Sequence, residues 1–522
     1  MNQLSTLSTY LLQAVASQSS PESSGKIHIN QLVAKMASLY EKLRNVMEYR
    51  EEAVVLRATI ERIIKRRLLL GGTGTTIAEP LVRELLWARY FSEQTITEEK
   101  IQVIGKKIDV YIRLRQEIVA RKMLGEHEVS EWINHLLSSD IEQYVNASFH
   151  KNLVAGFMFQ IMKSNVLIGD DSEQTRDVQV FIAVRKTFAK DDIAFLRYHL
   201  FLQYFGEVRE DNVLEIGSLF QIGYQEIQKQ LTYPLKDRIA SYVNNKTPIF
   251  FVLEDLLQVH GAGFADILKD SEESLSKAVF QACSARYSGI RQKVGRAIFR
   301  SVIFILLTKA FFAFAIEGSI ENVLYGGIDI RTMLVNVAVP PILMIMVGFN
   351  IRIPGKRNSE LIFQLLKEVM FQEKPDMGMP LEVLLVPKKG NPFLHGVFTL
   401  LWFLAFMLTF GAMVFVLSKA NFNIISQGIF IFFLTIVSFL SYRIWLMSRE
   451  YSVEKRPGLI SPLTDFFFMP IIRVGRSLTE GIAQINILLF VFDFIIETPF
   501  KGLFAFFEQW FFFLHAKREE LE

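Results

Sequence analysis

The sequence predicts an all-α protein in which a large N-terminal cytoplasmic helical domain precedes a multi-pass α-helical membrane domain. Four apolar segments between residues 297 and 447 each approach the roughly 20 residues that a helix needs to cross a bilayer. In the preceding part of the chain, apolar residues recur every three or four positions, which is the spacing of amphipathic helices. No stretch alternates with period two for long enough to predict a sheet.

The membrane domain is predicted over residues 291–450. Its third span, GVFTLLWFLAFMLTFGAMVFVL, carries no charge and is therefore the clearest transmembrane helix in the sequence. The first span contains Arg300 and Lys309, the second is short and contains two adjacent prolines, and the fourth ends through Arg443. The four predicted spans cover residues 297–316, 333–349, 396–417 and 424–447.

The basic residues near these spans predict the orientation. Lys and Arg cluster before the first span, between the second and the third, and after the fourth, whereas the two opposite loops contain few of them. Cytoplasmic loops carry such an excess of positive charge. We therefore expect a multi-pass protein of the cell membrane, with both termini and the loop over residues 350–395 in the cytoplasm.

The composition excludes several classes of protein and of site. The single cysteine, Cys283, excludes an internal disulfide and any zinc site that needs two or more thiolates. A net charge of +3 over 522 residues gives no global basic field, so we expect no nucleic-acid partner. We expect no cofactor and no metal site.

The N-terminal part is predicted as a tail followed by helices. Residues 1–27 are polar and lack the positively charged start of a signal peptide, so we predict a disordered tail. Residues 28–290 form the predicted cytoplasmic domain, as one helical bundle or two, beginning with a long amphipathic helix over residues 30–70. We expect residues 28 to about 285 to fold in water without the spans, because these helices carry charged faces.

The sequence GGTGTT over residues 71–76 allows two interpretations. Its backbone N–H groups could hold a phosphate at a helix N-terminus, or its residues could form the turn between two helices. The sequence lacks the Lys-Ser/Thr ending of a P-loop, which favours the turn.

Two groups of basic residues are candidates for contacts with lipid headgroups. The first group lies at a helix C-terminus, where cations are also favoured in water by the negative end of the helix dipole. The second group lies at the border of a predicted span. The candidates are Arg62, Lys65, Arg66 and Arg67 before the turn, and Arg291, Lys293 and Arg296 before the first span.

Three potential metal ligands, His127, Glu131 and His135, are spaced by one helical turn each. On a straight helix the first and last lie about 12 Å apart, which is too far for all three to reach one ion at about 2 Å. A solvated helix face is the better interpretation. The sequence contains no catalytic triad, dinucleotide fingerprint or paired cysteines, so we predict that the protein is not an enzyme.

The tail over residues 451–522 is predicted to form amphipathic helices associated with the membrane. Its apolar stretch is nearly long enough to span, but it carries Arg473, Arg476, Asp493 and Glu497. The last helix is rich in Phe and Trp, as in an aromatic anchor at the interface. We favour helices lying in or dipping into the cytoplasmic leaflet over a fifth span.

Polar residues inside the spans are candidate functional sites, because a charge at mid-membrane costs several kcal/mol unless it is satisfied. Lys309 could pair with Asp493 or Glu497 if the tail re-enters the bilayer, or its ammonium could extend to the outer face. The second span contains further candidates for a kink or a polar path, namely Asn336, Pro340 and Pro341.

These observations favour a non-enzymatic membrane protein whose helical cytoplasmic domain binds or organises partners at the bilayer. The expected partners are the lipid bilayer and other proteins, or a second copy of this chain. The alternative is a transporter or channel subunit with a path near Lys309 and the second span. An enzyme that uses the glycine-rich turn for a nucleotide is the weakest hypothesis.

Overall fold

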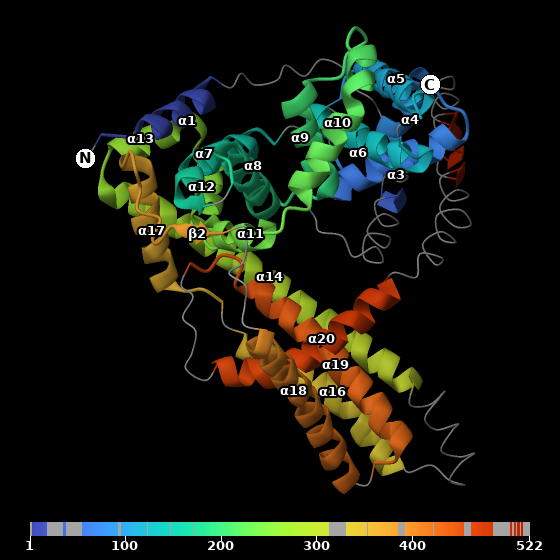
Figure 1. The fold of residues 1–522 in the computed structure, drawn as a ribbon, viewed down its shortest axis with the longest axis vertical. Coiled ribbons are helices and arrows are strands. Elements are labelled where there is room, and N and C mark those ends of the chain that lie inside the picture. Colours follow the sequence, from blue (N-terminus) through green and yellow to red (C-terminus); the bar gives the residue numbers. More distant parts are fainter. Residues whose placement is uncertain are drawn as a thin grey trace. The chain divides into compact units, whose positions relative to one another are not determined.

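The computed structural model arranges the chain in two compact units (Figure 1). The N-terminal unit consists mainly of Leu4–Phe250 together with Gln372–Leu385, and the C-terminal unit of Phe251–Phe371 together with Val386–Ile485. The residues that the structure describes are 3–17, 35–37, 55–91, 96–122, 124–146, 148–169, 171–312, 330–351, 353–384, 392–420, 422–453, 461–483 and short pieces between 502 and 514.

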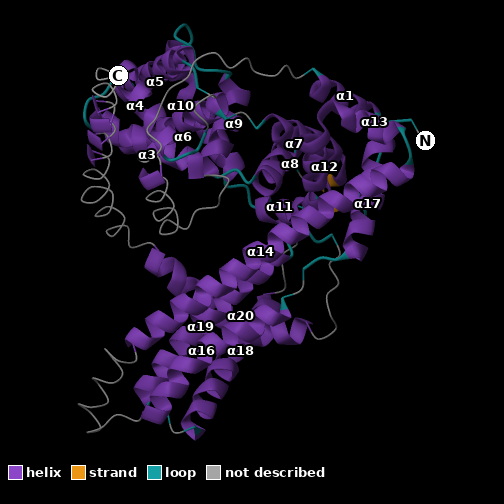
Figure 2. Ribbon diagram, turned by 180° about the vertical axis from the view of Figure 1, so that it is seen from behind, coloured by secondary structure: helices purple, strands orange, loops and turns teal. Residues whose placement is uncertain are grey.

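The described residues are overwhelmingly helical (Figure 2), which confirms the all-α class. The N-terminal unit contains α1 (Thr6–Ala16), α3 (Val55–Leu69), α4 (Gly74–Trp87), α5 (Glu98–Ala120), α6 (Glu126–Val145), α7 (Phe149–Met162), α8 (Glu173–Val184), a π-helical turn (Arg185–Ala189), α9 (Ile193–Phe205), α10 (Val213–Leu231), α11 (Lys236–Asn244) and the first residues of α12 (Thr247–His260).

Local capping explains where several of these helices begin. The Thr97 hydroxyl accepts a hydrogen bond from the Lys100 backbone N–H at the start of α5, and Ser172 does the same for Thr175 at the start of α8. The Asp192 carboxylate accepts two backbone N–H groups at the start of α9. These side chains satisfy donors that the first turn of a helix leaves without an internal partner.

The core of the N-terminal unit lies between α3, α4, α5, α6, α9 and α10. Its largest fully buried side chains include Trp132, Tyr111 and Phe220, and Trp132 meets Phe220 edge to face with ring centroids 6.0 Å apart. The apolar periodicity of the sequence therefore does mark the faces that pack together.

The structure places a helix where the sequence predicts a disordered tail. Within residues 1–27, α1 is N-capped by Ser5, buries Leu11, Leu12 and Val15, and packs on α7. Its polar appearance is misleading, because the buried residues occupy only one face. The predicted helix over residues 30–70 is described as α3 and as a helical piece at 35–37, and its other residues lie outside the described part.

One short parallel ladder joins two distant segments of the N-terminal unit. β1 (Val166–Ile168) pairs with β2 (Leu381–Val383), and the Gly169 N–H donates to the Val383 carbonyl at 3.0 Å. Three-residue strands leave no periodic pattern in a sequence. Part of the predicted cytoplasmic loop over residues 350–395 therefore completes the N-terminal unit.

The C-terminal unit is an elongated bundle built along one long helix. Its elements after α12 are α13 (Phe264–Lys269), α14 (Glu272–Phe312), α16 (Ile330–Asn350), α17 (Lys356–Phe371), α18 (Pro392–Lys419), α19 (Ile424–Ser448) and α20 (Ser461–Ala483). α13, α16, α17 and α19 all pack on α14, and α20 packs on α18 and α19.

Two of the described helices are long and apolar enough to cross a membrane, over Gly396–Lys419 and Ile424–Ser448. A shorter apolar helix covers Val337–Met346, inside the predicted second span. The predicted first span is described as far as Phe312, as the end of the 41-residue α14, and residues 313–316 lie outside the described part. Two candidate spans are therefore found where the sequence predicts four.

Candidate functional site

The most unusual side chain of the C-terminal unit is Lys309, which is fully buried between α14 and α19. Its Nζ lies 4.9 Å from the centroid of the Phe433 ring. A cation over an aromatic face is stabilised by the ring quadrupole, by about 2 kcal/mol when both are shielded from water. The side chain is buried and contacts a ring of α19, whereas one alternative from the sequence is an ammonium that extends to the outer face.

A buried apolar cluster lies on the same helices as this lysine. Ile305, Met344, Val437 and Ile444 belong to one buried cluster shared by α14, α16 and α19. The Ser441 hydroxyl donates to the Met344 sulfur at 3.3 Å, so a polar group on α19 is satisfied within this interface.

The other intramembrane candidates lie on α16 or beyond the described residues. Pro340 and Pro341 are buried inside α16, which continues as one helix through both of them. Asn336 is in the same helix, and its side chain lies outside the described part. Asp493 and Glu497 also lie outside it, so the pairing of Lys309 with either one stays a prediction.

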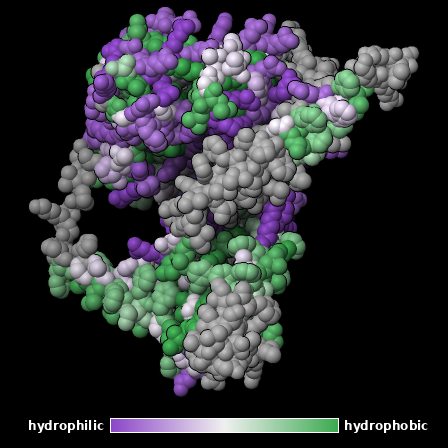
Figure 3. Space-filling view, turned by 90° about the vertical axis from the view of Figure 1, so that its right-hand side faces the viewer, coloured by the Kyte–Doolittle hydropathy of each residue, from purple (hydrophilic) through white to green (hydrophobic). Residues whose placement is uncertain are grey.

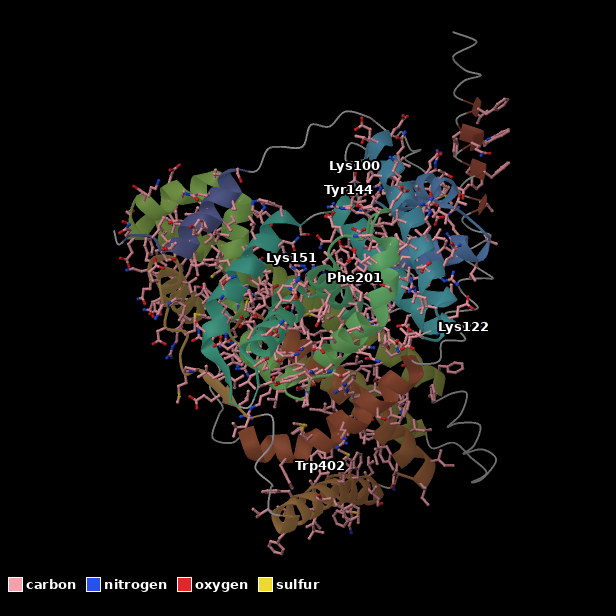
Figure 4. The ribbon with its side chains drawn as sticks, turned by 45° about the horizontal axis from the view of Figure 1, so that its top comes forward. Lys100, Lys122, Tyr144, Lys151, Phe201 and Trp402 are labelled. Carbon is pink, nitrogen blue, oxygen red and sulfur yellow. The ribbon has the colours of Figure 1, made fainter. Side chains whose placement is uncertain are left out.

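α20 lies across α18 and α19 (Figure 1) rather than alongside them. At the crossing, a Cβ added to Gly475 would lie 2.1 Å from the Thr435 carbonyl oxygen, so only glycine permits this approach. Beside it, the Arg473 guanidinium lies 5.6 Å from the ring of Trp402 on α18, which is labelled in Figure 4.

A second cluster of polar and aromatic contacts in the C-terminal unit surrounds Arg286 of α14. The guanidinium lies between two rings, 5.0 Å from that of Phe251 and 4.8 Å from that of Tyr451. It also donates to both carboxylate oxygens of Asp255 and to the Phe251 carbonyl. Burial lowers the pKa of Arg286, but the bonded Asp255 outweighs it and leaves the pKa raised.

Asn358 of α17 adds hydrogen bonds to the Arg286 cluster, and we call the two together the Arg286–Asn358 clasp. Its amide donates to the Tyr287 hydroxyl at 2.7 Å and to the Tyr451 carbonyl at 2.9 Å, and its side-chain oxygen accepts the Val453 N–H at 2.9 Å. The end of α12, α14, α17 and the segment after α19 are thus tied together by polar contacts. Burial raises the pKa of the neighbouring Cys283 thiol, which keeps it in its neutral, unreactive form.

In the N-terminal unit, the glycine-rich turn forms a close helix contact. The Gly74 N–H, at the start of α4, donates to the Asp109 carboxylate at 2.7 Å. A Cβ on Gly74 would lie 2.0 Å from the Gly105 carbonyl oxygen, so the two glycines allow α4 and α5 to touch. Because a carboxylate of the chain already occupies this helix N-terminus, the geometry favours the turn over a phosphate cradle.

The basic residues before this turn form ion pairs with glutamates of the same chain. Arg66 donates to both carboxylate oxygens of Glu84, at 2.9 and 2.8 Å, and Arg67 donates to one of them at 2.6 Å. Lys65 pairs with Glu61 at 2.5 Å. The Arg66 and Arg67 contacts hold α3 against α4, whereas the Lys65 pair lies within α3, and all of them compete with any contact to a lipid headgroup.

Two of the three potential metal ligands, Glu131 and His135, contact one arginine, and the third, His127, is exposed. Arg197 of α9 contacts the Glu131 carboxylate at 3.0 Å and His135 Nδ1 at 2.8 Å, and its guanidinium lies 4.9 Å from the Trp132 ring. Burial and the Arg197 charge lower the pKa of His135 to about 4, despite the nearby Glu61. Among the residues that the structure describes, no group of three or more His, Cys, Asp and Glu side chains could hold a metal ion.

Next to this trio lies a buried polar network that the sequence did not indicate. Arg57 of α3 donates to Asp192 at 2.9 Å, to Glu61 at 2.6 Å and to Ser138 at 3.3 Å. Burial alone would raise the pKa of Glu61, but Lys65 and Arg57 lower it to about 2. The network joins α3, α6 and the start of α9. Arg57 and Glu61 are one turn apart on α3, but Ser138 and Asp192 come from distant parts of the sequence.

Glu142 is a buried acid beside this network. Its Oε2 has no hydrogen-bond partner among the described residues. Burial raises the pKa of Glu142 to about 8, and the nearby Asp191 and Asp192 charges add to this effect against Arg57 and Lys151. The carboxyl group is therefore neutral near pH 7.

Comparison with known proteins finds no matching family model, no matching curated protein and no matching solved structure. The chemistry of these clusters is consequently argued from their geometry alone.

Replacement of Glu142 by Gln should stabilise the protein at pH 8 and hardly change its stability at pH 4.5. Between the ordinary pKa of 4.5 and the folded value of about 8, the folded state binds the proton more tightly, so stability falls as pH rises. The neutral amide does not titrate and so avoids this loss of stability, which is about 4 kcal/mol at pH 8. Unfolding midpoints of parent and variant measure the difference, with the exposed Glu382→Gln as the control. An effect of equal size at both pH values would contradict the buried acid.

The Lys309–Phe433 contact should appear as a coupling energy. Phe433→Leu removes the ring face under the ammonium, so its cost should be about 1 to 2 kcal/mol smaller in a Lys309→Met background than in the parent. Thermal unfolding of the two single variants and the double variant in detergent completes the cycle. Phe432→Leu, at the adjacent ring, should show no such coupling to Lys309→Met, and equal coupling at both rings would argue against a cation–π contact.

Proposed function

We propose that the protein is a multi-pass integral membrane protein that anchors a helical binding or scaffolding module at the cytoplasmic face of the cell membrane. In this proposal α14, α16, α18 and α19 provide four spans, and the N-terminal unit lies in water. The proposal takes both termini to be cytoplasmic, in agreement with the distribution of Lys and Arg.

The observation that carries the proposal is the outward-facing apolar surface of the C-terminal helices. Figure 3 displays hydrophobic residues gathered over these helices, whereas the visible face of the N-terminal unit is largely hydrophilic. A water-soluble protein rarely exposes a contiguous apolar patch beyond a few hundred Å². The exposed apolar side chains of α18 alone are Phe393, Leu394, Phe398, Leu400, Leu401, Phe403, Leu404, Met407, Leu408, Val414, Phe415 and Val416.

The N-terminal unit offers a surface suited to a protein partner. On α10, Leu214 and Ile222 are each 67% exposed and Leu219 is 45% exposed. Apolar side chains of this size on a charged helical unit are typical of interaction surfaces. This feature supports a binding or scaffolding role rather than a catalytic one.

The topology can be tested by cysteine labelling, because the native Cys283 is buried. In a Cys283→Ala background, Ala420→Cys lies between the third and fourth predicted spans, and Lys374→Cys lies in the loop before the third. Both positions are exposed. A membrane-impermeant maleimide should label Ala420→Cys on intact cells, and Lys374→Cys only after permeabilisation. The reverse pattern would overturn the proposed orientation, and release of the protein by alkaline carbonate would overturn its membrane insertion.

A transporter or channel subunit is the second candidate, and the burial of Lys309 is the observation that favours it. Ionisable residues inside membrane helices commonly mark ion or substrate pathways. The apolar packing of Ile305, Met344 and Val437 around the same helices favours the anchoring role instead.

Flux through proteoliposomes separates these two candidates. Under the leading proposal, liposomes that contain the purified protein leak ions and small solutes no faster than empty liposomes. A flux that Lys309→Met abolishes and Phe432→Leu preserves would establish the second candidate in its place.

A further inference from the structure

We propose that Lys293, Arg296 and Arg300 of α14 form a binding site for the headgroups of anionic phospholipids. This inference rests on the proposed function, because it requires α14 to enter the bilayer. It goes beyond that function by assigning a ligand class to a defined face of one helix.

The three cations share one side of α14. They follow one another by steps of three and four residues, which places them in a single stripe along the helix. All three are exposed, whereas the neighbouring Ile290 and Val294 are buried. Arg291 is also exposed, but its helical position falls outside the stripe, and the sequence alone did not single out Arg300 as a headgroup contact.

The same face of α14 changes from charged to apolar within one turn after Arg300. Ile303, Phe304, Leu307 and Phe311 follow the stripe and are all exposed, with Leu307 at 62% and Phe311 at 65%. A helix that leaves the headgroup layer and enters hydrocarbon requires this order of cations followed by apolar residues. The boundary on α14 therefore lies between residues 300 and 303.

Distances along the helices agree with this boundary. Lys309 lies nine residues beyond Arg300, or about 14 Å deeper, which is near the middle of a hydrocarbon core about 30 Å thick. On α19, Phe433 lies at the level of Lys309. Because α19 runs antiparallel to α14, the residues of α19 at the level of Arg300 follow Phe433 in the sequence, and they include Tyr442 and Trp445. Tyr and Trp are the residues enriched at the membrane interface.

Arginine–tryptophan pairs mark the same end of the bundle. The Arg449 guanidinium lies 5.0 Å from the Trp445 ring at the end of α19, and Arg473 of α20 lies over Trp402 near the start of α18. Such pairs combine an interfacial ring with a cation that can reach a phosphate. An anionic lipid surface is the partner complementary both to the α14 stripe and to these pairs of cations and aromatic rings.

The test measures how an anionic lipid stabilises the purified protein in neutral detergent. Phosphatidylglycerol should raise the melting temperature of the parent, and phosphatidylcholine should not. In the Lys293→Gln, Arg296→Gln, Arg300→Gln variant, the phosphatidylglycerol concentration for half of this rise should increase by up to about a hundred-fold, since each cation near an anionic surface contributes about five-fold. The charge-preserving Arg296→Lys, Arg300→Lys variant should retain the parent response.

The matched control removes three exposed lysines elsewhere, as Lys106→Gln, Lys269→Gln, Lys277→Gln, and should respond as the parent does. If the triple stripe variant does not fold, the single variants Arg296→Gln and Arg300→Gln should each show about a five-fold increase. An unchanged response in the stripe variants would overturn the proposal. An equal rise in melting temperature with inorganic phosphate alone would also overturn it, because the site would then take a free anion. Carbonate extraction of the parent reports separately on the membrane insertion that the proposed function requires.

Discussion

The C-terminal unit depends on the continuity of α14. This single helix of 41 residues contacts α13, α16, α17 and α19, so the position of each follows from its course. One helix axis must satisfy two different environments, since its first half carries charged residues and its second half exposes Phe, Ile and Leu. An α-helix meets this demand because its backbone hydrogen bonds are internal and do not depend on water.

Two arginines of this protein are each held by several polar or aromatic partners. Arg286 lies between two rings and is bonded to Asp255, and Arg57 serves an aspartate, a glutamate and a serine. Breaking such a cluster leaves an uncompensated buried charge, which costs several kcal/mol. Both clusters join three or more helices, so they fix the register of helices whose apolar faces alone would tolerate sliding.

Helices could be predicted from the hydropathy of the sequence, whereas contacts between residues far apart in the sequence could not. Hydropathy predicts apolar helices over 396–417 and 424–447, and the structure has α18 and α19 there. The helix α1 was missed, because its buried face contains few residues within a polar segment. The Arg286–Asn358 clasp was also missed, since its members come from four separate segments and share no spacing. The sequence shows Lys309 as a charge in a predicted span, but its aromatic neighbour on α19 follows only from the packing of the helices.

The pairing of β1 with β2 has a consequence for biosynthesis. Ile168 and its partner Val383 are separated by about 215 residues, and a ribosome adds about 5 to 20 residues per second, so β1 waits some 10 to 40 seconds for its partner. Throughout this interval the backbone edge of β1 is without β2, and α14 and α16 leave the ribosome before β2 does. A nascent chain in this state is a substrate for chaperones. A fragment that stops near residue 285 retains the same open edge permanently, so the N-terminal unit becomes complete only after the chain has passed through the first half of the bundle.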